Sequence, residues 1–306
     1  MWRWSALGVV LVGCGFHASA AGDGGAAGAN CFARWLDGSV ALAPPQPLTA
    51  LTSAGDERDP WISADGLALY FDRDPGVHMN NDIYVATRTS RADEFANPAA
   101  VDNLDTASDE ARATLDGDGT LLALSSNRTV GRFQIFVSSR GSTTEMFPSP
   151  SQPDQAMVAS VNLGADNVYD PFLSQDGLRL YLAPVVAGAA QQVAMSTRAP
   201  GGRFDGWAPL AGINSGAGDA DPALSLDERV IVFTSSRALP GSGASNLWYA
   251  TRQRASDDFT APQPIPTVNG DTDDGDPMLS ADGCELYFAS TRTGGKYHLF
   301  RAQVAM

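Results

Sequence analysis

Asp-Pro pairs recur along this 306-residue chain, and aspartates at this spacing could form a binding or catalytic site. The aspartates are Asp59, Asp170, Asp221 and Asp276, and Arg112 stands at the matching place in one further copy. If a fold gathers these carboxylates at one point, they focus negative potential and attract a cation or a basic group. A suitably spaced pair of carboxylates also supports acid and base catalysis. We therefore ask which elements bring the copies together.

Each copy opens a repeated unit with a turn and an apolar strand. The five copies read "DPWISADGLALYF" from Asp59, "RATLDGDGTLLAL" from Arg112, "DPFLSQDGLRLYL" from Asp170, "DPALSLDERVIVF" from Asp221 and "DPMLSADGCELYF" from Asp276. The turn aspartates, Asp65, Asp118, Asp176, Asp227 and Asp282, follow one another at intervals of 51 to 58 residues. Self-similarity at a near-constant interval indicates a repeat architecture.

The pattern inside each unit predicts short β-strands. Leu67, Leu69 and Phe71 alternate with Ala68 and Tyr70, and the Asp-Gly pair before them favours a tight hairpin. Segments such as "DIYVATR" and "NLWYATR" supply a further strand in each unit, and a Pro- or Phe-containing linker supplies another. Because no window of a dozen residues shows a helical stripe, the sequence predicts an all-β chain with four strands in each unit.

A single four-stranded antiparallel sheet exposes two apolar faces to water and leaves two edge strands unpaired. Radial packing of such sheets, face against face, buries the faces and leaves only short edges. Five units of the observed period account for residues 35–306. The sequence therefore predicts one domain, a five-bladed β-propeller of four-stranded antiparallel blades.

The ends of this domain predict how the ring closes. The last unit reaches only its third strand, at "YHLFRAQV", whereas "SVALAPPQPLTALTSAGDE" before the first unit resembles a fourth strand without partners. We expect this N-terminal strand to pair with residues 297–304. Closure brings Cys31 near the last blade, which favours a disulfide between Cys31 and Cys284. The alternative is a buried thiol at Cys284 and an exposed thiol at Cys31.

The full unit, "D-x-x-P-x-x-S-x-D-G-x-x-L-Y-F-x-S-x-R" followed by "D-I-Y-V-A-T-R", resembles the WD-like repeat of TolB-like β-propellers in exported bacterial proteins. The resemblance covers about 250 residues. It implies that the first strand of every blade lines an axial channel, which places Asp59, Asp170, Asp221 and Asp276 around one mouth. It implies no particular partner, because the separate N-terminal domain of TolB has no counterpart here.

Two interpretations of these aspartates stay open at this point. Repetition favours a role in blade packing, in which arginines after the second strands pair with the aspartates of neighbouring blades. Those arginines are Arg73, Arg128, Arg237 and Arg292. The asymmetric copy with Arg112 favours a binding site instead, because a site requires the blades to differ.

The composition and the missing motifs argue against several classes of function. Asp and Glu outnumber Lys and Arg by 35 to 20, and no basic cluster appears, which argues against nucleic-acid binding. No G-x-S-x-G motif or zinc-ligand spacing occurs. A glycoside hydrolase that uses channel carboxylates remains open. Calcium is a weaker prediction for "DGDG" at 116–119 and "NGDTDDGD" at 269–276, which lack the spacing of an EF-hand loop.

The first residues predict export. The run "MWRWSALGVVLVGC" combines Arg3, an apolar stretch and a sequence like the lipobox, with Cys14 as the lipidated residue. Residues 1–14 then form the signal peptide, and residues 15–34 form a Gly/Ala-rich flexible tether. Plain secretion, with cleavage after Ala20, is the alternative. In the first case the protein is a lipoprotein of the bacterial envelope, on the outer membrane facing the periplasm or the surface.

These observations combine into one functional hypothesis and one alternative. The hypothesis is a non-enzymatic, monomeric, exported TolB-like propeller without a required cofactor. Its acidic channel mouth, with Asp59, Asp170, Asp221, Asp276 and Arg112, binds an envelope protein or peptide, and only the lipid anchor contacts a membrane. The alternative is a carbohydrate-active enzyme, a glycoside hydrolase that uses the channel carboxylates.

Overall fold

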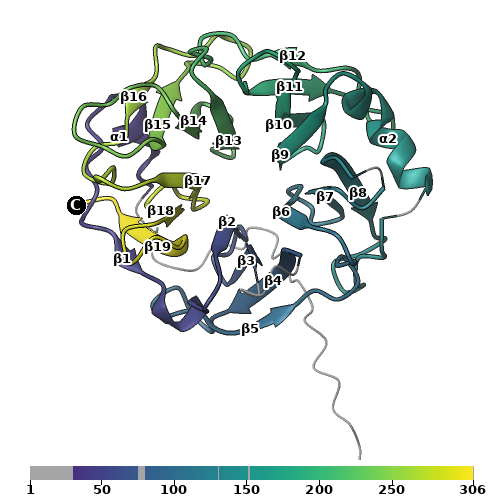
Figure 1. Cartoon of the computed structure of the whole chain (residues 1–306), viewed down its shortest axis with the longest axis horizontal. Helices are drawn as coiled ribbons and strands as arrows, with labels where there is room; N and C mark the ends of the chain where they lie inside the picture. The colour runs from purple at the N-terminus through teal and green to yellow at the C-terminus, as the bar shows by residue number, and fades with distance from the viewer. Residues whose placement is uncertain (1–29, 75–79, 130, 151, 306) are drawn as a thin grey trace, which may run out of the picture.

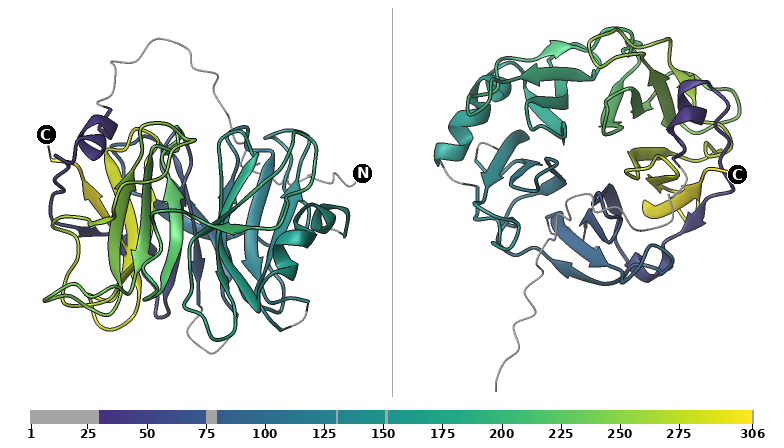
Figure 2. Two further views of the ribbon diagram at one scale, coloured as in Figure 1. Left: turned by 90° about the horizontal axis from the view of Figure 1, so that it is seen from above. Right: turned by 180° about the vertical axis from the view of Figure 1, so that it is seen from behind.

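The computed structural model describes residues 30–74, 80–129, 131–150 and 152–305. Five antiparallel sheets stand around a central axis, with the first strand of each sheet innermost (Figure 1). The side view shows the strands running roughly along this axis (Figure 2). The prediction of an all-β five-bladed propeller is confirmed.

The strands follow the repeat in chain order. Blade one contains β2 (Glu57–Ile62), β3 (Ala68–Arg73), β4 (Asp82–Thr87) and β5 (Ala96–Ala100); blade two contains β6 (Glu110–Leu115), β7 (Leu121–Ser126) and β8 (Gln134–Ser139); blade three contains β9 (Asn167–Leu173), β10 (Arg179–Val185), β11 (Ala194–Thr197) and β12 (Ala208–Pro209); blade four contains β13 (Asp219–Leu224), β14 (Val230–Ser235), β15 (Asn246–Thr251) and β16 (Gln263–Pro264); blade five contains β17 (Asp274–Leu279), β18 (Glu285–Ser290), β19 (His298–Gln303) and β1 (Gln46–Pro47).

Blade two departs from the prediction because a helix, α2 (Gln152–Leu163), takes the place of a fourth strand. Val158 and Val161 of α2 are fully buried in the same apolar cluster as Val137 of β8. Asn162 accepts a hydrogen bond from the Ile135 backbone N–H and donates one to its carbonyl, both at 2.8 Å. Asn214 and Asn269 make the same pair of bonds at the third strands of blades three and four, so blade two keeps this contact although it lacks the fourth strand. The weak apolar stripe of α2 explains why the sequence did not predict the helix.

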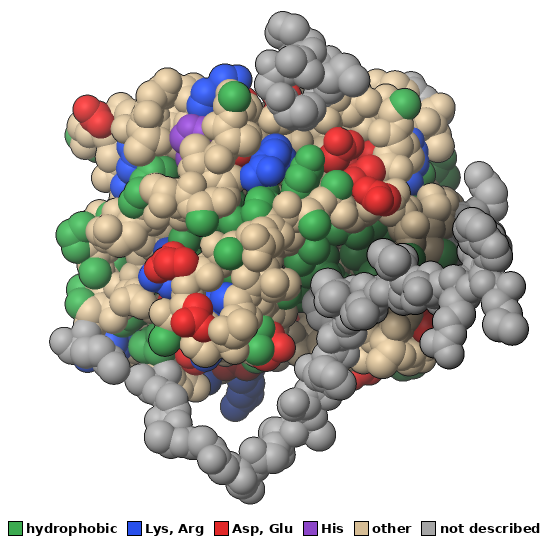
Figure 3. Space-filling model, turned by 90° about the horizontal axis from the view of Figure 1, so that it is seen from below, with side chains coloured by type: hydrophobic (Ala, Val, Ile, Leu, Met, Phe, Trp, Pro, Cys, Tyr) green, Lys and Arg blue, Asp and Glu red, His purple; other side chains and the backbone are tan. Residues whose placement is uncertain are grey.

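Each sheet packs one face against the preceding blade and the other against the following blade. Both faces of the sheet are therefore shielded from water. Phe233, Tyr287 and Leu182 on second strands are fully buried. Burial of side chains this large stabilises a fold by about 1.5–3 kcal/mol each. The outer wall carries acidic and basic side chains interspersed with small apolar patches (Figure 3). Among the described residues, no helix combines the length and the hydropathy that a membrane-spanning segment needs.

An arginine after the third strand locks the hairpin turn in four of the blades. The guanidinium Nε of Arg88, Arg140, Arg198 and Arg252 donates to the carbonyl of the turn residue in its own blade, at 2.6 to 2.8 Å. Each guanidinium also lies over a phenylalanine of the following linker, at 4.2 to 5.1 Å from the ring centroid. The "TR" and "SR" ends of the repeat therefore hold the turn, the third strand and the linker together.

The ring closes as predicted. Strand β1 pairs with β19, with Gln46 opposite Arg301 and Pro47 opposite Phe300. A further bridge joins Leu42 to Val304. The last blade therefore combines three strands from the C-terminal end of the chain with one from its beginning, so blade five unfolds only if the ring opens.

Blade five has no arginine after its third strand, and a short helix fills that role. In α1 (Phe32–Leu36), the Trp35 indole Nε1 donates to the Gly283 carbonyl at 2.9 Å, in the way the arginines do elsewhere. Cys31 and Cys284 form a disulfide beside this contact. Folded structure thus begins within the segment expected to be tether, while Cys14 and residues 15–29 lie outside the described residues. A disulfide indicates a compartment outside the cytoplasm.

We expect loss of the disulfide to weaken the closure. Replacing Cys31 and Cys284 together with serine should lower the free energy of unfolding by about 2–5 kcal/mol, because the bridge restricts a very long loop of the unfolded chain. Urea denaturation of the mature protein measures this change. Wild-type protein held in reducing buffer should match the double variant, and an unchanged midpoint in both would contradict the assignment.

Candidate functional site

One backbone feature recurs in every first strand. Asp59, Arg112, Asp170, Asp221 and Asp276 have φ between 49° and 55°, in the left-handed region. The pairing of every first strand with its second strand is irregular at this point, as a β-bulge requires. Aspartate tolerates this conformation better than most side chains, which accounts for its recurrence. The bulge turns all five side chains toward the channel.

The structure brings the five predicted residues into one buried cluster, with each side chain between 5% and 9% exposed. Arg112 donates to Asp59 at 3.0 Å and reaches across the channel to the Pro222 carbonyl at 3.1 Å. Asp170 accepts a long hydrogen bond from the Asp221 N–H, and Asp221 accepts one from the Asp276 N–H, both at 3.4 Å. The ring aspartates therefore link consecutive blades as well as facing the channel.

The pKa values within this cluster move in opposite directions. Burial, reinforced by the charges of neighbouring aspartates, raises the pKa of Asp170 and of Asp276 well above the ordinary carboxyl value. Burial also opposes ionisation of Asp221, but the charge of Arg112 and several hydrogen bonds outweigh it and lower that pKa. Burial beside Asp59 raises the pKa of Asp72 on β3 as well. Neighbouring carboxyl groups of this cluster therefore differ in how readily they ionise.

An open pocket of about 510 Å³ lies over this cluster, on the side where the first strands begin. Asp59, Asp170, Asp221 and Asp276 line it. Its walls include Tyr169, Gln191 and Arg58, whose guanidinium stacks 3.5 Å from the centroid of the Tyr297 ring. We call this cavity the mouth pocket. It offers carboxyl groups, aromatic faces and amide groups to a bound molecule.

The arginines after the second strands do not pair with the ring aspartates, so that prediction is wrong. Arg73, Arg128, Arg237 and Arg292 instead pair within their own blades, with Glu57, Glu110, Asp219 and Asp274 at 2.6 to 3.3 Å. These acids stand two residues before the ring position and are fully buried. The sequence carried a signal for this pairing, because blade three lacks both partners: Val168 stands at the place of the acid, Pro184 at the place of Arg73, and Val186 at the place of the other three arginines. The ring carboxylates are thereby left without these cations.

Two acidic groups could hold a metal ion. One oxygen from each of Asp59, Asp221 and Asp276 lies within 4.8 Å of the other two. The same holds for Asp82, Asp105 and Glu110, where burial raises the pKa of Asp105 to about 7. Hard oxygen ligands suit Ca²⁺ or Mg²⁺. Of the loops predicted as weaker calcium sites, 116–119 contributes no residue to either group and 269–276 contributes only Asp276, among the described residues.

No family model and no curated protein matches the chain. Solved structures match it in fold. A thermostable family-43 glycoside hydrolase has a TM-score of 0.54 at 11% identity, covering 81% of this chain and 88% of that one. An α-L-arabinofuranosidase from Podospora anserina, in complex with cellotriose, has a TM-score of 0.53 at 12% identity, covering 85% and 95%. TolB from Acinetobacter baumannii has a TM-score of 0.44 at 16% identity, covering 71% and 45%.

The likenesses to the two glycoside hydrolases show the propeller fold alone.

We expect Arg112 to be indispensable for the ring. Replacing Arg112 with methionine should lower the free energy of unfolding by about 3–5 kcal/mol, because it leaves buried carboxylates without their cation. Adding Asp59→Asn should restore part of the loss. Exposed Arg203→Met serves as the control for the loss of one positive charge. Urea denaturation of the four proteins, wild type included, tests this, and equal effects of Arg112→Met and Arg203→Met would contradict it.

The raised pKa of Asp276 predicts how stability depends on pH. The folded protein binds a proton that the unfolded chain releases above about pH 4, so this group destabilises the fold increasingly as the pH rises toward its raised pKa. Asp276→Asn mimics the protonated form and should raise Tm at pH 8 but leave it unchanged at pH 4. The gain is about 1.4 kcal/mol for each unit of the shift.

Thermal unfolding at both pH values, in buffer that contains a chelator of divalent ions, measures the difference. Exposed Asp258→Asn is the matched control. A lower Tm for Asp276→Asn at pH 8 would show that the ionised form is the one the fold needs.

Proposed function

We propose that the mouth pocket binds a carbohydrate and that its carboxyl groups hydrolyse a glycosidic bond. The observation that carries this proposal is the pair Asp221 and Asp276, adjacent acids at the pocket floor whose pKa values move in opposite directions. Such a split supplies a base or nucleophile and a general acid in one site. Asp221 is the ionised partner and Asp276 the proton donor.

The dimensions of the pocket support a sugar ligand. Its volume of about 510 Å³ exceeds that of one sugar ring, and it opens to solvent. Tyr169 provides an aromatic side chain against which a sugar ring packs, while Gln191 and Arg58, which is held over the Tyr297 ring, provide hydrogen bonds. The fold likeness to family-43 and other glycoside hydrolases is consistent with this proposal.

The separation of the acids bears on stereochemistry. Oxygens of Asp221 and Asp276 lie within 4.8 Å of each other. An inverting enzyme needs about 6.5–9.5 Å between its carboxyl groups to admit water, whereas a retaining enzyme needs about 5–5.5 Å. The proposal therefore includes retention of configuration at the anomeric carbon.

Hydrolysis of a panel of plant and bacterial glycans by the mature protein tests the proposal. Asp221→Asn and Asp276→Asn should each lower the rate by about 10²–10⁴-fold, because each removes one proton-transfer or nucleophilic group. Asp102→Asn, at an exposed loop position, should leave it unchanged. NMR of the first product formed shows the anomer. Absence of any hydrolysis, with a well-folded protein, would contradict the proposal.

A second candidate is binding without catalysis, in which the mouth pocket holds a basic peptide of an envelope protein. One specific observation favours it: Asp276 Oδ2 is buried without a hydrogen-bond donor in the structure, although carboxylates surround it. A ligand ammonium or guanidinium would satisfy that oxygen. Calorimetric titration with a short oligolysine separates the two candidates. Binding that Asp59→Asn, Asp221→Asn and Asp276→Asn abolish together, without glycan hydrolysis, supports this second function.

The place of action is part of the same proposal. The disulfide favours export, and a lipid on Cys14 would hold the ring at the bacterial envelope through the segment before Cys31.

A further inference from the structure

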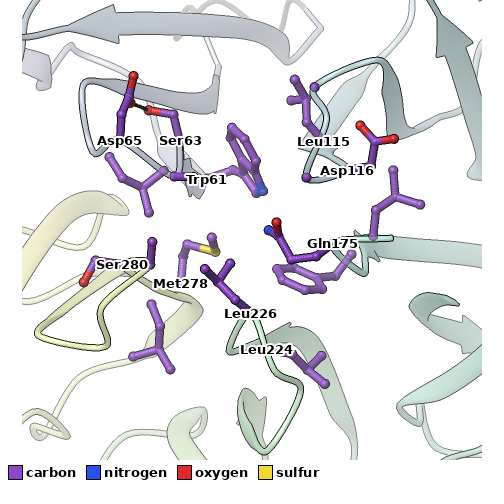
Figure 4. A pocket seen from close by; sticks show the side chains of 18 of the residues that line it. Trp61, Ser63, Asp65, Leu115, Asp116, Gln175, Leu224, Leu226, Met278 and Ser280 are labelled. Atoms are coloured by element: carbon purple, nitrogen blue, oxygen red, sulfur yellow. Dashed lines mark hydrogen bonds between the residues drawn. The ribbon is translucent and has the colours of Figure 1, made fainter. Parts of the chain in front are cut away.

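The opposite end of the channel contains a second, smaller cavity of about 290 Å³. It lies among the hairpin turns that join first and second strands, and it shares no lining residue with the mouth pocket. We call it the turn pocket. The close-up shows Trp61, Leu226, Met278 and Gln175 directed toward its middle (Figure 4).

Apolar side chains form most of the turn pocket. Trp61, Phe172 and Met278 stand two residues beyond the ring aspartates of their strands and form its floor with Leu115 and Leu224. Leu226 is 43% exposed at its rim, which is unusual for a large apolar side chain on this protein. An apolar cavity that opens to water and is bordered by a few polar groups is typical of a small-molecule site.

The charged side chains that line the turn pocket are all acidic, although Arg198, outside the lining, acts electrostatically on Asp116. Asp65, Asp116 and Asp118 line it, and none of the described residues that line it is basic. All three aspartates come from the turns of blades one and two, and Asp65 and Asp116 stand at the edge of the cavity (Figure 4). The pocket thus combines an apolar floor with negative charge on one side.

The other blades show that this unbalanced charge is specific to the pocket. The turn aspartates Asp176, Asp227 and Asp282 each form an ion pair, with Arg179, Arg229 and Arg91 respectively, and none of them lines the cavity. Within the described residues, Asp65, Asp116 and Asp118 form no ion pair. Partial burial raises the pKa of Asp116 although Arg198 acts to lower it, so a further positive charge on the pocket side would favour the ionised carboxylate.

We propose that the turn pocket binds a small organic cation, in which an apolar body of about the size of one aromatic ring carries an ammonium group. The apolar body packs between Trp61, Phe172 and Met278. The ammonium group lies toward Asp65 and Asp116, where it also meets the electron-rich face of the Trp61 indole. This site is independent of the mouth pocket and of any activity there.

Calorimetric titration with three probes of similar shape tests the charge preference. Tryptamine carries a positive charge, indole carries none and indoleacetate carries a negative charge at pH 7. We expect tryptamine to bind at least tenfold more tightly than indole and indoleacetate not to bind measurably. Equal affinity for tryptamine and indoleacetate would overturn the proposal.

Matched variants locate the site. Asp65→Asn with Asp116→Asn keeps the hydrogen-bond acceptors of both turns and removes their charge, and it should weaken tryptamine binding at least fivefold. Asp176→Asn with Asp227→Asn makes the same change at paired turn positions outside the cavity and should leave affinity unchanged. Trp61→Leu should also weaken binding, with its fold checked by thermal unfolding.

Two results would contradict the location. One is equal weakening by the two Asp-to-Asn pairs, which would indicate a general effect of net charge. The other is loss of tryptamine binding in Asp276→Asn with no loss in Asp65→Asn/Asp116→Asn, which would place the ligand in the mouth pocket instead.

Discussion

A left-handed backbone conformation at one residue in each first strand determines what the channel contains. Five short strands could line an axis with alternating side chains and leave nothing but a narrow apolar core. The bulge at Asp59, Asp170, Asp221, Asp276 and Arg112 interrupts that alternation and turns a polar side chain inward from every blade. Because four of the five are acids, the centre of the ring carries an electrostatic cost that hydrophobic packing elsewhere must offset. Arg112 lowers that cost, and raised pKa values at Asp170 and Asp276 lower it further.

Eight further arginines have partners within their own blades. Each arginine after a second strand has its own acid in the same blade, so it holds the blade and leaves the ring aspartates alone. Each arginine after a third strand is occupied by a turn carbonyl and a phenylalanine. The chain therefore uses eight of its 20 Lys and Arg residues to hold blades together. What is left over is an acidic mouth pocket at one end and an apolar, acid-edged turn pocket at the other.

Departures from the repeat explain how the ring closes and why the two ends of the channel differ. In blade five, Trp35 and the disulfide replace the missing arginine, which ties the beginning of the chain to its last unit. In blade two, helix α2 packs against β8 where the other blades have a fourth strand. In blades one and two, the turn aspartates lack the arginine partners found in the other blades. Perfect repetition would build a symmetric ring with equivalent positions, so these departures are where the two ends of the channel acquire distinct chemistry.

The sequence by itself determined the blade number, the strand order, the closure by the N-terminal strand and the set of residues that meet at the channel, because each follows from local periodicity and turn chemistry repeated five times. It did not determine helix α2, whose place depends on packing against β8 rather than on a strong apolar stripe. Nor did it determine which cation neutralises which acid, since Arg73 is nearer in sequence to Asp59 than to Glu57 and yet pairs with Glu57, which lies opposite it across the strands. The opposed pKa values and the turn pocket arise from groups of different blades, so only the tertiary structure decided them.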